Sequence, residues 1–148
     1  MFHPNRLSLT LLMLGAPIPS TADAQLTRPP TTKPTVIAGP ATLTARGGPT
    51  TILLIFPGVV GAGGFRVTRT NNAGDPETIL FEGGLDKFAF NGAACTVAQG
   101  CAYTDAAVSR GFLYSYRVYS LFPNSAGPPI VSPPSPVASA QLKFARLP

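Results

Sequence analysis

The feature that most constrains the fold is a long alternating run at residues 112–121. In an extended chain, successive side chains point to opposite faces of the strand. This period places Tyr114, Tyr116 and Val118 on one face of the run. The opposite face carries the more polar set of Ser115, Arg117 and Tyr119. The run therefore predicts a half-buried strand, of the kind found in antiparallel sheets that pack one face on a core.

Shorter extended runs flank this one and are separated by turn residues. Glycine and proline mark the breaks, for example at 46–49 and 58–64. The runs that read as further strands are residues 41–45, 50–56, 64–70, 78–81, 103–105 and 137–142. Together with the run at 112–121 they predict an all-β protein.

Residues 82–102 are the hardest part of the chain to interpret. Phe88 and Phe90 alternate as they would in a strand. The glycines on both sides of them interrupt any long pairing, because a glycine in a strand interior weakens the strand. A short strand at these two phenylalanines is therefore left open.

The N-terminal segment has the parts of a cleavable export signal. His3 and Arg6 precede a short apolar run at 7–14, and Ala22-Asp23-Ala24 forms a small-x-small cleavage pattern. The apolar run is shorter than the roughly 20 residues that a membrane-spanning helix needs. We expect residues 1–24 to be a signal peptide, with a short retained membrane anchor as the alternative. The exported product is then periplasmic, cell-surface or secreted.

The distribution of proline divides the rest of the chain. Prolines are concentrated near the two ends of the exported part, at 29–34 and 128–136, while the centre carries the alternating runs. Proline-rich segments adopt extended polyproline geometry and act as stiff spacers. We therefore expect a Pro/Thr-rich linker at 25–38, a folded domain at 39–142 and a C-terminal tail at 143–148.

The net charge of +5 comes from basic residues that are spread along the chain. No block of four or more Lys or Arg is present to displace counterions from a polyphosphate, so nucleic acid is not an expected partner. Two interpretations of the charge stay open: weak attraction to an anionic envelope polymer, and simple solubility. The sequence does not indicate an oligomeric state.

Two cysteines, Cys95 and Cys101, are the only ones in the chain. An exported protein with one pair of cysteines is expected to oxidise them to each other. A redox-active or metal-binding pair is the alternative, but the spacing is not Cys-x-x-Cys and a metal site needs further ligands. We predict a disulfide that closes a short loop.

The sequence offers little for catalysis. Its single histidine, His3, lies in the expected signal peptide, so the exported product has no imidazole for base catalysis or metal binding. Glu82 and Asp86 are a weak candidate for a glycosidase-type acid pair. Asp75, Glu77 or Asp86 could contribute to a calcium site, but too few oxygens cluster there. We expect no enzymatic activity, no metal and no cofactor.

Two further features are given structural roles. Asp105 follows a strand and precedes Ala106, which predicts that its carboxylate caps turn amides. The glycines at 58–64 suggest a phosphate-binding loop, but the Gly-Lys-Ser/Thr ending and the following helix are missing. A glycine-rich connection between strands is the better interpretation.

In this order, the segments resemble a fibronectin type III domain. The Tyr103-Thr-Asp105 motif and the run from Gly111 to Val118 match the family's Tyr-Thr-Asp and Gly-x-x-Tyr-x-Tyr-x-Val motifs. Phe56-Pro57 stands where the family has Trp-Pro, and Gly64-Phe-Arg-Val-Thr-Arg69 is similar to the family's third strand. Ser132-Pro-Pro-Ser135 matches the lead into the last strand. The chain departs from the family in lacking tryptophan and in the length of the 82–102 segment.

The resemblance implies a seven-stranded antiparallel β-sandwich, with a generic immunoglobulin-like sandwich as the alternative. It places Tyr114 at the family's tyrosine corner. The side chains expected in the core are those on the inward faces of the second, third and sixth runs. They are Phe56, Phe65, Val67, Tyr114, Tyr116 and Val118.

The function expected of such a chain is a non-catalytic binding or spacer module that contacts a protein or an envelope polysaccharide. A purely structural envelope or assembly protein is the alternative. A hydrolase accessory or carbohydrate-binding module is a more remote one. Contacts are expected at the loops around Gly61, 71–75 and 91–101, and on an exposed sheet face. The candidate contact residues are Arg66, Arg69, Asn71, Asn72, Arg117 and Tyr119.

Overall fold

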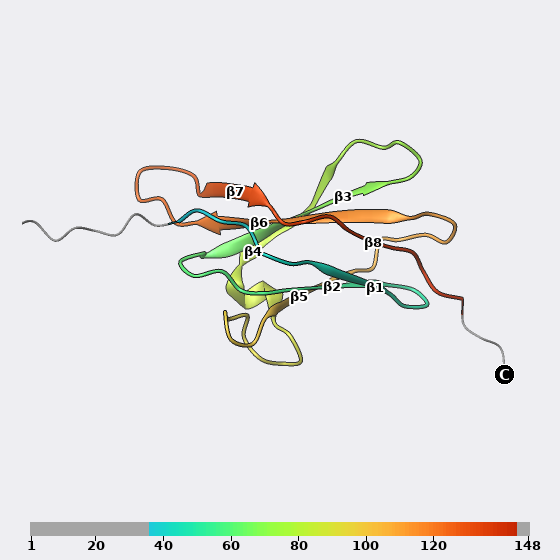
Figure 1. The fold of residues 1–148 in the computed structure, drawn as a ribbon, viewed down its shortest axis with the longest axis horizontal. Coiled ribbons are helices and arrows are strands. Elements are labelled where there is room, and N and C mark those ends of the chain that lie inside the picture. The colour runs from blue at the N-terminus through green and yellow to red at the C-terminus, as the bar shows by residue number, and fades with distance from the viewer. Residues whose placement is uncertain (1–35, 145–148) are drawn as a thin grey trace, which may run out of the picture. The chain divides into compact units, whose positions relative to one another are not determined.

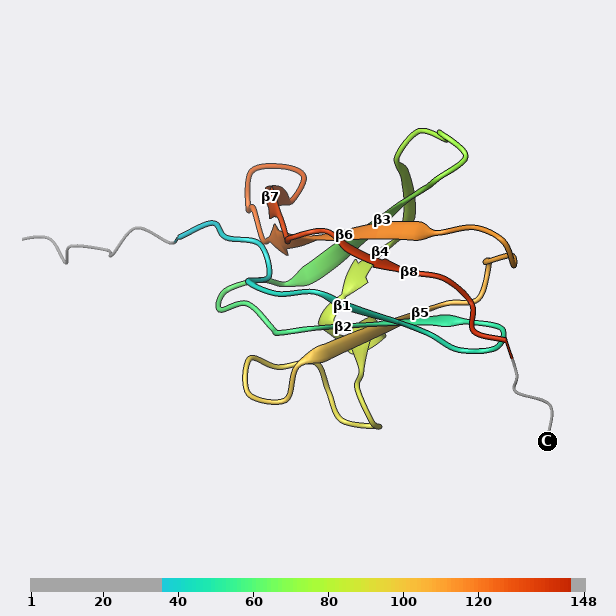
Figure 2. The same ribbon diagram turned by 45° about the vertical axis from the view of Figure 1, so that its right-hand side comes forward.

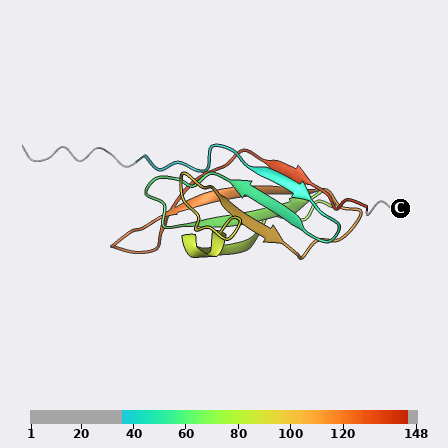
Figure 3. The same ribbon diagram turned by 90° about the horizontal axis from the view of Figure 1, so that it is seen from below.

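Two antiparallel sheets, stacked face to face, form the part of the chain that the computed structural model describes, residues 36–144 (Figure 1). The smaller sheet has the order β1-β2-β5, and the larger has the order β4-β3-β6-β7, with β8 also paired to β6. Figure 3 shows the smaller sheet laid across the larger one. The strands are β1 (Thr44–Gly47), β2 (Ile52–Phe56), β3 (Gly64–Asn71), β4 (Thr78–Gly84), β5 (Cys101–Asp105), β6 (Tyr114–Phe122), β7 (Ile130–Pro134) and β8 (Ala138–Ala140).

The core lies between the sheets and is built by the alternation seen in the sequence. β2 alternates between buried and partly buried positions along its whole length, with Ile52, Leu54 and Phe56 pointing inward. Val67 of β3 lies opposite Val118 of β6 in the larger sheet, and both are fully buried. All six side chains expected in the core are buried: Phe56, Phe65, Val67, Tyr114, Tyr116 and Val118. The prediction of an antiparallel β-sandwich is confirmed.

The segment at 82–102 completes the core in a way that the sequence did not predict. Phe88 is fully buried in a short 3₁₀ helix, η1 (Leu85–Phe88), and not in a strand. Its ring packs edge-on against Phe65 at 5.5 Å and Phe56 at 5.9 Å between centroids. Phe90 makes only an isolated bridge to Ala93. The interpretation of Phe88 and Phe90 as part of a strand is therefore wrong. Edge-to-face packing of Phe56, Phe65 and Phe88 thus fills this part of the core.

The expected last strand at 137–142 corresponds to β8, which is shorter than expected, and an additional strand, β7, precedes it, so residues 36–144 form eight strands where seven were expected. Prolines interrupt the strand because they have no N–H to donate to the ladder. Serine hydroxyls restore the pairing: the backbone N–H of Val118 donates to Ser135 Oγ at 3.0 Å, and that of Ser120 donates to Ser132 Oγ at 2.8 Å. The Ser-x-x-Ser motif thus satisfies buried donors of β6 that would otherwise be unpaired.

The C-terminal segment is packed beyond the expected end of the domain at Leu142. The N–H of Lys143 donates to the carbonyl of Gly48 at 2.9 Å. Gly47, expected in a turn, ends β1, and a Cβ on it would collide with the carbonyl of Gln141. This position therefore requires glycine because two backbones approach closely.

The predicted signal peptide at 1–24 and most of the predicted linker lie outside the described residues. Within 36–144, no helix is long and apolar enough to cross a membrane.

Candidate contact surfaces

The start of β6 is fixed by a tyrosine corner. The backbone N–H of Ser109 donates to the hydroxyl of Tyr114 at 2.9 Å, so the strand is tied to the loop that precedes it. The guanidinium of Arg69 lies over the Tyr114 ring, 4.9 Å from its centroid. This arrangement holds the β5–β6 loop against the sandwich.

A buried polar cluster lies beside the tyrosine corner and includes Arg69, whose side chain was expected on the surface but is only 20% exposed. The carboxylate of Asp105, whose side chain is 2% exposed, accepts bonds from Arg69 Nη1 at 2.7 Å and from the Tyr116 hydroxyl at 3.0 Å. It also accepts from the N–H of Ala107 at 3.0 Å, which confirms the predicted cap. Burial, followed by the nearby Asp105 charge, raises the pKa of Tyr116 far above its usual range. Arg69 therefore bonds to groups within the fold. The two-residue period of β3 places its side chain on the same face as Phe65 and Val67.

The outer face of β3 and β6 carries a second polar network. Glu77 accepts hydrogen bonds from the Thr68 hydroxyl at 2.5 Å, from Arg117 Nη1 at 3.0 Å and from the Tyr119 hydroxyl at 3.2 Å. The bond from Thr68 is the main reason that the pKa of Glu77 lies below its usual value, although burial opposes it. Burial and Glu77 together raise the pKa of Tyr119. The expected contact residues Arg117 and Tyr119 are thus bonded to each other through one carboxylate.

The remaining expected contact residues also have partners within the chain. Arg66 Nε pairs with Glu82 at 2.6 Å across β3 and β4. Asn71 shapes the β3–β4 turn by donating to Asp75 at 2.7 Å, and Asn72 accepts the N–H of Leu113 at 3.1 Å. The positive charge expected from Arg66, Arg69 and Arg117 on the surface is therefore neutralised locally.

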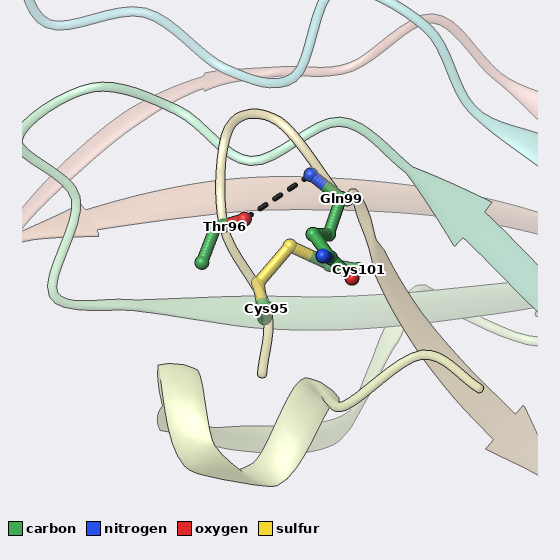
Figure 4. The surroundings of a disulfide bond; sticks show 4 residues. All are labelled: Cys95, Thr96, Gln99 and Cys101. Atoms are coloured by element: carbon green, nitrogen blue, oxygen red, sulfur yellow. Dashed lines mark hydrogen bonds between the residues drawn. A yellow bond between two sulfur atoms is a disulfide. The ribbon is translucent and has the colours of Figure 1, made fainter. Parts of the chain in front are cut away.

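The disulfide between Cys95 and Cys101 is formed, as the sequence predicted (Figure 4). Inside the loop that it closes, the N–H of Gln99 donates to Thr96 Oγ1 at 3.1 Å, and the N–H of Gly100 donates to the Thr96 carbonyl at 2.9 Å. Gly100 has φ of 79°, a conformation that glycine adopts without strain. The loop is therefore held by a covalent bond and by two hydrogen bonds.

The disulfide loop packs directly on the β2–β3 loop. A Cβ on Gly58 would collide with the backbone of Thr96 and Val97, so the two loops touch through their main chains. Between them lies a groove of about 340 Å³ with mostly apolar walls. Val60 and Val97 stand at this groove and are 76% and 56% exposed. The sequence predicted contacts at both loops but did not single out these valines, which only the meeting of the loops brings together.

The expected contact loops divide between the two ends of the sandwich. The β2–β3 and disulfide loops meet at one end, which we call the disulfide end. The β3–β4 turn lies at the opposite end, where the N–H of Asn72 donates to the Leu113 carbonyl at 3.1 Å (Figure 2). The three loops expected to form contacts thus do not make one surface.

The glycine-rich loop at 58–64 joins β2 to β3, as expected. Within residues 36–144, no group of three or more His, Cys, Asp or Glu side chains is placed to hold a metal ion. Asp86 pairs with Lys87 at 3.0 Å, and Glu82 with Arg66, so these two carboxylates have separate partners.

The strand order and the tyrosine corner show that the fold is a fibronectin type III-like β-sandwich. The sequence matches no protein-family model and no curated protein. Among solved structures, it is similar to a beta-1,2-glucanase from Parabacteroides distasonis, with 16% identity and a TM-score of 0.53, over 75% of this chain but only 13% of the glucanase.

Two smaller structures are similar over their whole length. One is a myokine, with 10% identity and a TM-score of 0.50 over 74% of this chain and 100% of that one. The other is an Fn3-like protein from Clostridium thermocellum, with 21% identity and a TM-score of 0.45 over 74% of this chain and 100% of that one. At these identities the likeness concerns the fold alone.

Proposed function

We propose that this chain is an exported, non-catalytic binding module that contacts a protein partner through its disulfide end. The observation that carries the proposal is the groove between the disulfide loop and the β2–β3 loop, with Val60 and Val97 exposed beside it. Isolated exposed apolar side chains are ordinary on protein surfaces. Here two of them stand on either side of a mostly apolar groove that both loops help to form.

The rigidity of the disulfide end supports a binding role. Ordering a loop when a partner binds costs free energy, and a loop that is already fixed avoids that cost. The disulfide and the bonds to Thr96 fix one loop, and the contact at Gly58 fixes the other against it. The groove is therefore suited to receive an apolar side chain of a partner.

The carboxylates support the non-catalytic part of the proposal. Glu77, Glu82 and Asp105 each hold basic side chains within the fold. A carboxylate committed to such a pair stabilises structure and is poorly placed to exchange protons with a substrate. Export is supported by the disulfide, because such bonds persist in oxidising compartments.

The proposal is tested by retention of envelope proteins on the purified exported protein. We expect one protein to be retained saturably by the wild type, and to be lost with V60D/V97D, because a charge in the groove must be desolvated on binding. Ile79→Asp is the matched control, since Ile79 is an exposed apolar residue on β4 and not at the groove.

Thermal melts establish that all three proteins are folded. Equal retention by V60D/V97D and the wild type would show that the disulfide end is not the contact surface. Absence of any saturable retention would favour a spacer over a binding module.

A further inference from the structure

Basic side chains are distributed unevenly over the sandwich. Within residues 36–144, four of them pair with carboxylates at 4 Å or less, which neutralises the body of the domain. These pairs are Arg66–Glu82, Arg69–Asp105, Lys87–Asp86 and Arg117–Glu77. The other basic residues of the described part, Arg46, Arg110 and Lys143, have no carboxylate partner there and are exposed. In the part of the chain that the structure describes, the uncompensated positive charge is thus confined to these three positions.

The three uncompensated side chains gather at one end of the sandwich, opposite the disulfide end. Arg46 comes from β1, Arg110 from the β5–β6 loop and Lys143 from the segment after β8, and these segments meet at the end shown on the right in Figure 2. Arg46 and Lys143 line one groove of about 580 Å³, together with Phe144. The guanidinium of Arg110 lies over the Phe144 ring, 5.9 Å from its centroid. Phe144 therefore connects all three charges.

The groove combines positive charge, hydrogen-bonding groups and an apolar surface. Phe144 is 81% exposed. Gln141 lines the same groove and supplies an amide, whereas the hydroxyl of Ser139 is bonded to Ser115 at 2.7 Å. The volume falls within the range of about 300–1,000 Å³ that is usual for small-ligand sites. The C-terminal segment that forms one wall is held to the β1–β2 turn by the bond from Lys143 to Gly48.

We propose that this groove, which we call the cationic groove, binds an acidic polysaccharide built of uronic acids. Arginine matches the planar geometry of a carboxylate and binds it with two parallel hydrogen bonds. An aromatic ring offers a flat apolar surface to the C–H face of a sugar, and the Gln141 amide can bond its hydroxyls. A chain of uronic acids carries carboxylates, hydroxyls and apolar faces in alternation, which is what the groove combines.

A nucleic acid fits these observations less well. Its affinity depends on neutralising many phosphates along a strand, and three basic residues in one groove neutralise few. The proposal concerns the end of the domain opposite Val60 and Val97, so it stands independently of the protein partner proposed above.

The test is binding of the purified exported protein to polygalacturonate, measured by calorimetry. We expect saturable binding that weakens as salt rises from about 20 to 200 mM, because the charges are at the surface. The triple variant R46Q/R110Q/K143Q should bind at least about tenfold more weakly, since three exposed charge contacts of modest strength are lost. F144A, which keeps every charge, should bind several-fold more weakly if the ring stacks on a sugar.

Lys87→Gln is the matched control, because it removes one positive charge outside the groove, from the exposed pair with Asp86. Its affinity should stay within about twofold of the wild type. A loss of affinity with K87Q as large as that with the triple variant would show unspecific attraction and overturn the proposal. Equal or tighter binding of oligothymidylate would show that the groove prefers a nucleic acid to a uronate. Unchanged binding of polygalacturonate by the triple variant would show that the cationic groove is not the binding site. Neutral amylose should not bind.

Discussion

Replacing Asp105 should lower the free energy of unfolding by a large amount for so small a side chain. Asp105 is the last residue of β5, is buried, and accepts three hydrogen bonds, from Arg69, Tyr116 and Ala107. Replacing it by alanine removes all three bonds and leaves the guanidinium of Arg69, whose side chain is only 20% exposed, without its carboxylate. The Asp105→Ala variant should therefore have a much lower free energy of unfolding.

The expected loss follows from the individual bonds. A hydrogen bond between charged groups contributes about 1.5–3 kcal/mol, and each of the two others contributes about 1 kcal/mol. The sum of about 3.5–5 kcal/mol agrees with the roughly 3–5 kcal/mol lost when one partner of a buried ion pair is removed. Arg69 keeps a bond to the carbonyl of Ala107 at 2.8 Å, so a loss near the lower end, about 3 kcal/mol, is expected.

The assay is urea unfolding followed by far-ultraviolet circular dichroism, because the chain has no tryptophan to report on unfolding by fluorescence. Asp86→Ala is the control: it breaks the exposed pair with Lys87 and should cost less than about 1 kcal/mol. In the double variant R69M/D105A, the loss should be smaller than the sum of the two single losses, because no buried cation is left unpaired. A loss below about 1 kcal/mol for Asp105→Ala would refute the reasoning.

Three other perturbations test separate parts of the structure. The C95S/C101S variant should lose roughly 2 kcal/mol in the free energy of unfolding by urea, because the disulfide removes the entropy of this short loop from the unfolded chain. No loss would mean that the disulfide does not constrain the unfolded chain. Folding lowers the pKa of Glu77, so the contribution of this carboxylate to stability is present above about pH 4.5 and is lost as the pH falls further. The free energy of unfolding, measured between about pH 6 and pH 3, should therefore depend less on pH in E77Q than in the wild type. An equal pH dependence of the two proteins would contradict the assignment. The S135A variant should lose about 1–3 kcal/mol in the free energy of unfolding, measured by thermal or urea unfolding, because the buried N–H of Val118 loses its acceptor. An unchanged free energy of unfolding would show that the hydroxyl is dispensable.

The sandwich could be predicted because its main strands are long and alternate over most of their length. In β6, burial alternates from Tyr114 to Ser120, and the inward positions Tyr114, Tyr116 and Val118 are buried as expected. The same period also contained the signal for the buried cluster. Arg69 is two residues beyond Val67 and four beyond Phe65, so it belongs to the inward face of β3. Its charge led to the expectation of an exposed side chain, whereas its register was the better guide, since a buried acceptor was available on β5.

The region between β4 and β5 could not be predicted, because no local pattern determines it. The 3₁₀ helix η1 has only four residues, and Phe88 is fixed by its packing against Phe56 and Phe65, which lie far from it in the sequence. The two ends of the sandwich present the same problem. Val60 and Val97 are 37 positions apart in the sequence and meet only because the disulfide loop folds onto Gly58.

The basic residues show a similar limit. Their number and spread along the sequence argue against a polyphosphate-binding block. Which of them are neutralised depends on partners that lie far away in the sequence, such as Glu77, which pairs with Arg117 across 40 positions. The uncompensated charge at Arg46, Arg110 and Lys143 therefore emerges only from the folded structure.

The central claim is that the disulfide end is a preformed surface for a protein partner. Its most direct test is site-specific photo-crosslinking in the intact exported protein, with a benzophenone amino acid placed at Val60, at Val97 or at Phe112 in the opposite β5–β6 loop. The same single protein should be crosslinked from Val60 and from Val97, and not from Phe112. No adduct at either valine, or an adduct formed equally from Phe112, would contradict the claim.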